Sequence, residues 1–177
     1  MSNAIKILPH YTYSDYEKWE GKWELIEGVP YAMSPAPVPR HQMVSTSLLV
    51  ALSNQLQQCK KCVVLQPVDY LVSEDTILQP DILIVCKPIE KKFLDFPPVL
   101  VAEILSPSTA LKDRHSKYSI YESQGIRYYI IIDSDKNEAE VYELQNGKYQ
   151  LMQLGKEFTF SFELDGCRAE IAFKEIW

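Results

Sequence analysis

The chain has 177 residues, of which 46% are apolar and 24% charged, with a formal net charge of −6. This size and balance predict one globular domain over residues 1–177 and argue against a broad basic surface for nucleic acid. Because no apolar run reaches the roughly 18 to 20 residues of a membrane helix and no signal-peptide pattern opens the chain, we expect a cytoplasmic protein without membrane contact.

A short helix and a hairpin are predicted at the start of the chain. The aromatic stretch before Trp19 indicates a helix capped by Ser14. Residues 22–33 alternate around Gly28, which predicts a hairpin whose first strand covers residues 23–27.

A loop and a long helix follow. Residues 34–39 contain too much proline for a helix or a central strand, so they predict a loop. A helix is then expected over about residues 40–58. Its inner face is marked by residues at helical spacing, namely His41, Val44, Leu48, Leu52 and Leu56.

The middle of the chain predicts buried strands at residues 63–72, 78–85 and 99–105. A helix capped by Ser108 or Thr109 is expected after the last of these, ending at Gly125. Further strands are predicted at residues 128–133, 139–144 and 149–154, the last two joined by a turn at Asn146-Gly147. The pattern predicts an α/β or α+β fold, with a mixed sheet flanked by helices.

Two carboxylates interrupt the apolar strands. Asp81 lies in the run of residues 79–85, and Glu103 lies in the run of residues 99–105. A buried carboxylate is costly unless it is paired, hydrogen-bonded or bound to a metal. Two such acids on neighbouring strands, followed by Lys117 on the next helix, could hold a divalent cation beside a scissile phosphate.

The helix after Glu103 carries three of the candidate site residues. Asp113, Lys117 and Tyr121 are four residues apart and share one face. Lys117 is interpreted as the residue that orients the water or stabilises the phosphate, although taken alone it would be a solvated helix residue. Asp113 is interpreted as an acid that suits the helix dipole, with pairing to Lys117 as the alternative. Tyr121 is interpreted as a core residue.

Other groups extend the candidate site. The carbonyl oxygen of Ile104 could serve as a third metal ligand beside Asp81 and Glu103. Glu24 could point into the same cleft. His41 is interpreted as a buried, hydrogen-bonded histidine, with a phosphate-contacting role as the alternative.

Taken in order, these segments resemble the Uma-two family of restriction-endonuclease-like proteins, within the PD-(D/E)xK nuclease superfamily. The matching residues are 24–28, 33–35, 40–42, 79–81, 103–109, Asp113, Lys117, Tyr121, 128–129 and Asp133. The resemblance implies a restriction-endonuclease-like central mixed sheet flanked by helices, with a metal bound by Asp81 and Glu103. In the superfamily the lysine stands two residues after the second acid, where this chain has Leu105, so Lys117 is interpreted as its replacement.

The leading hypothesis is therefore an endonuclease that uses Mg²⁺ or Mn²⁺ to hydrolyse DNA. The rival is a nuclease-like module that binds nucleic acid or a protein partner without cutting. The acidic composition and Leu105 favour the rival slightly, whereas the retained acids favour the enzyme. Cutting both strands generally needs two active sites, which a homodimer would supply.

The cysteines give no further motif. Cys59 and Cys62 form a single C-x-x-C with no second pair and no histidine at zinc-finger spacing, and Cys86 and Cys167 stand alone. We therefore expect reduced cytosolic thiols rather than a zinc or redox site.

Overall fold

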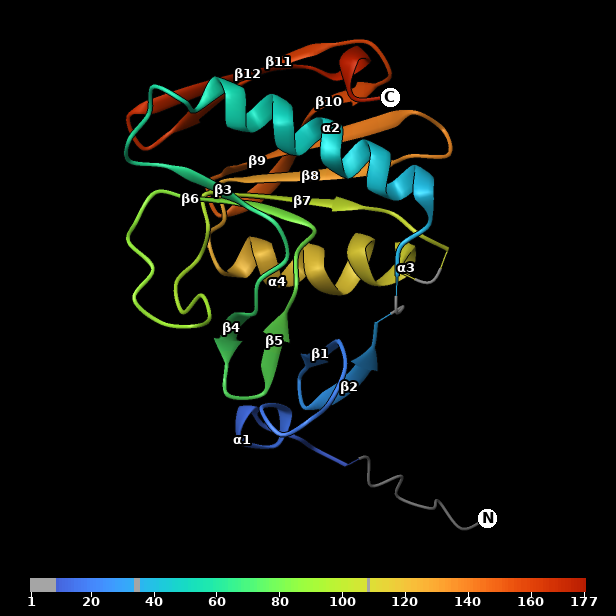
Figure 1. Ribbon diagram of the computed structural model, residues 1–177, viewed down its shortest axis with the longest axis vertical. Helices are drawn as coiled ribbons and strands as arrows, with labels where there is room; N and C mark the ends of the chain where they lie inside the picture. Colours follow the sequence, from blue (N-terminus) through green and yellow to red (C-terminus); the bar gives the residue numbers. More distant parts are fainter. Residues whose placement is uncertain (1–8, 34–35, 108) are drawn as a thin grey trace.

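A six-stranded mixed sheet with strand order β10-β9-β8-β7-β6-β3 runs through the centre of the molecule (Figure 1). The computed structural model describes residues 9–33, 36–107 and 109–177. The strands of this sheet are β3 (Val63–Leu65), β6 (Ile82–Val85), β7 (Leu100–Ile104), β8 (Tyr128–Asp133), β9 (Glu138–Gln145) and β10 (Lys148–Gly155). The mixed sheet confirms the predicted fold class.

The parallel pair β7–β8 is joined by a helical crossover, as parallel strands require. This crossover consists of α3 (Ala110–Lys112), the π-helix η1 (Asp113–Lys117) and α4 (Tyr118–Ser123). The crossover begins at the carboxyl end of β7, so it carries its side chains over the end of that strand.

Two layers cover the faces of the central sheet (Figure 1). One face is covered by α2 (Pro39–Gln55) and the hairpin of β11 (Thr159–Leu164) and β12 (Cys167–Ala172), which ends at the 3₁₀ turn η2 (Phe173–Glu175). The crossover helices lie on the other face, beside a smaller sheet of order β2-β1-β5-β4. This sheet contains β1 (Trp23–Ile26), β2 (Val29–Ala32), β4 (Tyr70–Ser73) and β5 (Thr76–Leu78), and α1 (Tyr13–Tyr16) precedes it.

Alternation along the central strands builds two apolar cores. Ile82 and Ala102 face α2, whereas Leu83 and Val101 face the crossover helices. Both β6 and β7 are buried along their whole length, which explains why their sequences are almost continuously apolar.

Two predicted strands are each split in two. Residues 63–72 divide into β3 and β4, and residues 78–85 divide between β5 and β6. Each break contains a proline, Pro67 or Pro80, which cannot donate a ladder hydrogen bond. The two halves then belong to different sheets. Asp81 consequently lies just before β6 rather than inside a strand.

Local turn chemistry was mostly predicted correctly. Asn146 and Gly147 have φ of 53° and 77°, as a tight hairpin turn requires. In the first hairpin the turn is Glu27-Gly28, so Glu27 lies in the turn and not in the strand. The capping prediction for Ser14 was wrong, because Thr12 caps α1 and shares a capping box with Asp15.

Thr109 occupies the N-cap position of α3, as one of the two predicted caps, whereas Ser34, Pro35 and Ser108 lie outside the described residues.

Helix α2 and its C-cap residue bury the predicted inner face: His41, Val44, Leu48, Leu52 and Leu56. In the described ranges, no helix combines the length and apolar character needed to cross a bilayer.

The expectation of unpaired thiols was wrong for this structure. Cys59 is bonded to Cys167, and Cys62 is bonded to Cys86. The sequence could not indicate these pairs, because the fold brings together residues 108 and 24 positions apart.

Candidate active site

Strand register places the two predicted acids opposite each other. Ile82 pairs with Ala102 in the antiparallel β6–β7 ladder, so extending that register by one residue puts Asp81 opposite Glu103. Both residues line the same cleft, and the negative charge of Asp81 contributes to a raised pKa of Glu103. The acids therefore face one space.

Asp81 makes its polar contacts with the rest of the protein through only one of its two carboxylate oxygens, among the described residues. Its Oδ2 accepts a 2.8 Å hydrogen bond from the Ile104 N–H and lies 3.3 Å from Nε2 of His41. In the described parts of the chain, no donor reaches Oδ1. Burial acts to lower the pKa of His41, but the carboxylate of Asp81 and the backbone of Ile104 raise it above its ordinary value. The contact with Asp81 therefore favours the protonated form of the imidazole.

Glu103, like Asp81, accepts hydrogen bonds from the described residues at only one of its two carboxylate oxygens. Its Oε1 accepts 2.9 Å and 2.7 Å hydrogen bonds from Lys117 Nζ and the Tyr121 hydroxyl, and no described donor contacts Oε2. Tyr121 is fully buried, as expected of a core residue, and it also fixes the orientation of the carboxylate.

Lys117 lies among three carboxylates. Its Nζ is 2.8 Å from Glu24 Oε1, 2.9 Å from Glu103 Oε1 and 3.4 Å from Asp113 Oδ1. The residue is only 2% exposed, so the interpretation of a solvated helix lysine was wrong. Burial would lower the pKa of Lys117, but the three acids raise it well above its ordinary value. Lys117 is therefore a charged group under ordinary conditions.

Asp113 and Glu24 surround this lysine. Asp113 is 1% exposed and lies in the first turn of η1, as the dipole interpretation expected, and it also pairs with Lys117, as the alternative expected. Its Oδ1 accepts no hydrogen bond from the described residues. Glu24 is fully buried and accepts the Gln79 N–H at 2.9 Å.

Lys112 was missed by the sequence reasoning. Its Nζ contacts Glu24 Oε2, so Lys112 and Lys117 both pair with Glu24. An ordinary α-helix would not bring two residues five apart onto one line, but the π-helix η1 does. The 3.6-residue period used for the prediction therefore could not find Lys112. Such π-helical turns recur at functional sites.

Charge balance in the site is uneven. Burial raises the pKa of Glu103 well above its ordinary value; Lys117 opposes this, and Asp113, Asp81 and Glu24 reinforce it. Burial also raises the pKa of Asp113. Glu24 differs, because two lysines outweigh its burial and lower its pKa. The site therefore holds more negative charge than Lys117 alone offsets.

A cleft of about 1050 Å³ opens onto these residues. Its lining includes His41, Asp81, Glu103, Asp113 and Lys117. The basic side chains of Lys22, Lys112 and His115 also line it, and this set is called the basic rim below.

The donor set fits a hard divalent cation. Asp81 and Glu103 each present one oxygen that is free of described donors, and Mg²⁺ is typically bound by one or two carboxylates together with waters. Among the described residues, Cys59, Cys62 and Cys167 form the one group of three acid, His or Cys side chains whose ligand atoms all lie within 4.8 Å. An ion at the acid pair would therefore be completed by backbone and water oxygens.

The fold is shared with a solved structure. A crystal structure described as "a putative nuclease belonging to DUF820", from Anabaena variabilis, matches with a TM-score of 0.74 and 17% identity. The match covers 93% of this chain and 96% of that one.

The sequence identifies the family. The Uma2 family model, described as "Putative restriction endonuclease", matches residues 13–167. The chain therefore belongs to the Uma2 family, which confirms the resemblance. "Uncharacterized protein slr1290" from Synechocystis sp. is 28% identical over 147 residues, 76% of this chain and 75% of that protein.

Proposed function

We propose that this chain is a magnesium-dependent endonuclease that hydrolyses DNA phosphodiester bonds in the cleft between Asp81 and Glu103. One observation carries the proposal. Each acid accepts hydrogen bonds from described donors at one oxygen only, and both residues line the cleft together with the buried Lys117. The carboxylate oxygens without described donors are therefore available as ligands for a hard divalent cation.

Asp81, Glu103 and the carbonyl oxygen of Ile104 would hold Mg²⁺ or Mn²⁺. The N–H and C=O of one strand residue point to the same side, so the Ile104 carbonyl faces Asp81, to which its N–H donates. When bound, such an ion polarises the phosphate and lowers the pKa of the attacking water. His41, now against Asp81, would move aside or contact the phosphate.

Lys117 would act as a cation rather than a base, because its raised pKa keeps it protonated. An ammonium group has three donors. Two are directed at Glu24 and Glu103, and Asp113 lies farther away at 3.4 Å. The third N–H would therefore stabilise the charge that develops on the phosphate as the water oxygen bonds to phosphorus and one ester P–O bond breaks.

Glu24 and Tyr121 would be positioning residues. Glu24 fixes Lys117 and Lys112 from the smaller sheet, while Tyr121 fixes Glu103 from α4. The position two residues after Glu103 is filled by Leu105, but the lysine ammonium reaches Glu103 from the crossover helix. This contact supports an active enzyme over a non-cleaving module.

The basic rim supports DNA as the substrate, and we propose that the protein acts in the cytoplasm. A homodimer would supply the two sites needed to cut both strands.

The test is cleavage of supercoiled plasmid and single-stranded DNA with Mg²⁺, Mn²⁺ or chelator. Wild type should cut with metal, and Asp81→Asn, Glu103→Gln and Lys117→Met should each lose at least about 100-fold in rate. Lys148→Met removes a lysine whose side chain is 74% exposed and paired with Glu122; it is the matched control and should cut normally.

Two results would contradict the proposal. Equal cutting by wild type and the acid variants would identify a contaminating nuclease. Binding of DNA by wild type without cutting under any metal condition would identify the non-cleaving module.

A further inference from the structure

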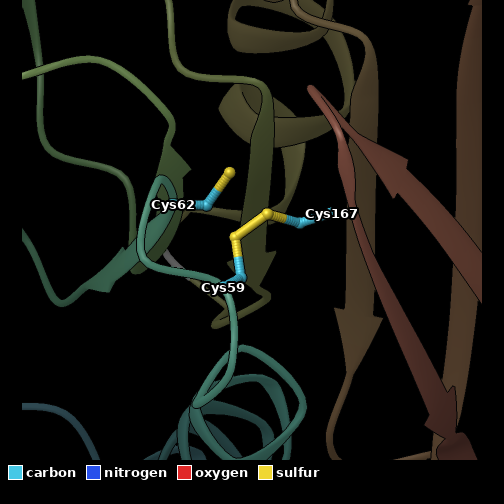
Figure 2. A group of neighbouring side chains, drawn as sticks. All are labelled: Cys59, Cys62 and Cys167. Atoms are coloured by element: carbon cyan, nitrogen blue, oxygen red, sulfur yellow. A yellow bond between two sulfur atoms is a disulfide. The ribbon is translucent and has the colours of Figure 1, made fainter.

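Three of the four cysteines meet at one point and the fourth is bonded to one of them, although the four come from three separate segments. Cys59 follows α2, Cys62 precedes β3, Cys86 follows β6 and Cys167 begins β12. The sulfurs of Cys59, Cys62 and Cys167 lie within 4.8 Å of one another (Figure 2). Cys86 joins the same cluster through its bond to Cys62.

Two independent cross-links do not require their sulfurs to gather in one cluster. The Cys59–Cys167 bond attaches the C-terminal hairpin, whereas Cys62 and Cys86 lie one step beyond the Val63–Val85 pair of the β3–β6 ladder. A tetrahedral zinc site does require such a cluster, since Zn–S bonds of about 2.3 Å place four sulfurs about 3.8 Å apart. The C-x-x-C spacing of Cys59 and Cys62 is also that of zinc ligands.

The surroundings of the cluster fit a structural zinc centre. Cys62 and Cys86 are 3% and 7% exposed, and structural zinc sites are closed to solvent. Lys60 and Lys61 lie between the first two cysteines, where their charges would offset the two excess negative charges of zinc with four thiolates. Lys61 Nζ also donates to the Asp165 carbonyl at 2.9 Å, which holds this loop against the hairpin turn beside Cys167 without any sulfur bond.

We propose that the four cysteines, when reduced, bind one zinc ion that anchors the β11–β12 hairpin to α2 and the central sheet. Each disulfide would take two electrons and two protons from a cellular dithiol, which is itself oxidised to a disulfide. Zinc would then displace the four thiol protons to water. The cluster thus has two cross-linked forms: two disulfides under oxidising conditions, and a zinc centre under reducing conditions.

This centre is separate from the proposed nuclease site. The cysteines adjoin the core on the α2 face, whereas Glu103, Lys117 and Tyr121 lie on the opposite face of the sheet. Its role would be to hold the hairpin whose Phe162, Leu164 and Ala169 side chains complete that core.

The test uses the full chain, reduced with a phosphine, exposed to zinc chloride and desalted. We expect one zinc per chain by elemental analysis. Cobalt chloride should instead give the thiolate-to-cobalt charge-transfer bands and the intense visible bands of tetrahedral cobalt. This spectrum reads the sulfurs of the wild-type protein directly, so it does not depend on whether a variant folds.

Variants assign the site. Cys59→Ser/Cys167→Ser should lose the zinc and the cobalt spectrum, whereas Asp81→Asn should keep both. Absence of zinc and of cobalt–thiolate bands in the reduced wild type would overturn the proposal. So would zinc that survives in the double cysteine variant and disappears in Asp81→Asn.

Discussion

Replacing Lys117 with methionine tests the buried charge cluster most sharply. The substitution keeps the length of the side chain but removes the cation between Glu24, Glu103 and Asp113, all of which are essentially buried. Breaking a buried ion pair from one side costs about 3–5 kcal/mol, because the remaining charge is left uncompensated. In a domain of this size, about 2–4 °C of melting temperature is lost per kcal/mol, so Lys117→Met should melt about 6–20 °C lower than wild type.

The assay is thermal unfolding at pH 8 in chelator, with two comparisons. Lys148→Met removes an exposed pair and should shift the free energy of unfolding by no more than about 0.5 kcal/mol. Adding Glu103→Gln to Lys117→Met should recover part of the loss, because one unpaired charge is removed with it. Wild-type stability of Lys117→Met, or no recovery in the double variant, would refute the buried-cluster reasoning.

Three further predictions concern the two acids and Lys112. Because the pKa of Glu103 is raised in the folded state, the stability that Glu103 contributes is present below its ordinary pKa of 4.5 and is lost as the pH rises. The melting temperature of wild type in chelator should therefore fall above pH 4.5 relative to that of Glu103→Gln. Parallel curves of melting temperature against pH for the two proteins would contradict this. Asp81→Asn and Glu103→Gln should each melt no lower than wild type in chelator at pH 8. Millimolar Mn²⁺ should stabilise wild type but neither variant. If calorimetry shows both variants melting several degrees lower than wild type, the acids are structural groups. Lys112→Met should slow DNA cleavage less than Lys117→Met, because Lys112 is the more exposed partner of Glu24; an equal loss in single-turnover rate would contradict this order.

Several parts of this architecture were predictable from local patterns. The apolar runs of β6, β7 and β8 and the Asn146-Gly147 turn carry strong signals, because burial on both faces and positive φ each restrict residue choice. The acids stood out because a carboxylate conflicts with such a run. The single-domain organisation over residues 1–177 stays a prediction.

The remaining features depend on contacts between distant segments. Pro67 and Pro80 divide two strands between different sheets, which a count of apolar residues does not detect. The π-helix η1 places Lys112 beside Glu24 through a period that the α-helical pattern does not contain. The sulfur cluster exists only once β12 lies beside the end of α2.

The role of the acid pair is tested most directly by a crystal soaked in manganese chloride. Anomalous diffraction should place one Mn²⁺ between Asp81 and Glu103, with the Ile104 carbonyl as a third protein ligand and oxygen ligands at about 2.0–2.6 Å. His41 should then have left Asp81. An empty acid pair at millimolar manganese, or an ion bound only at the cysteines, would contradict the proposed nuclease site.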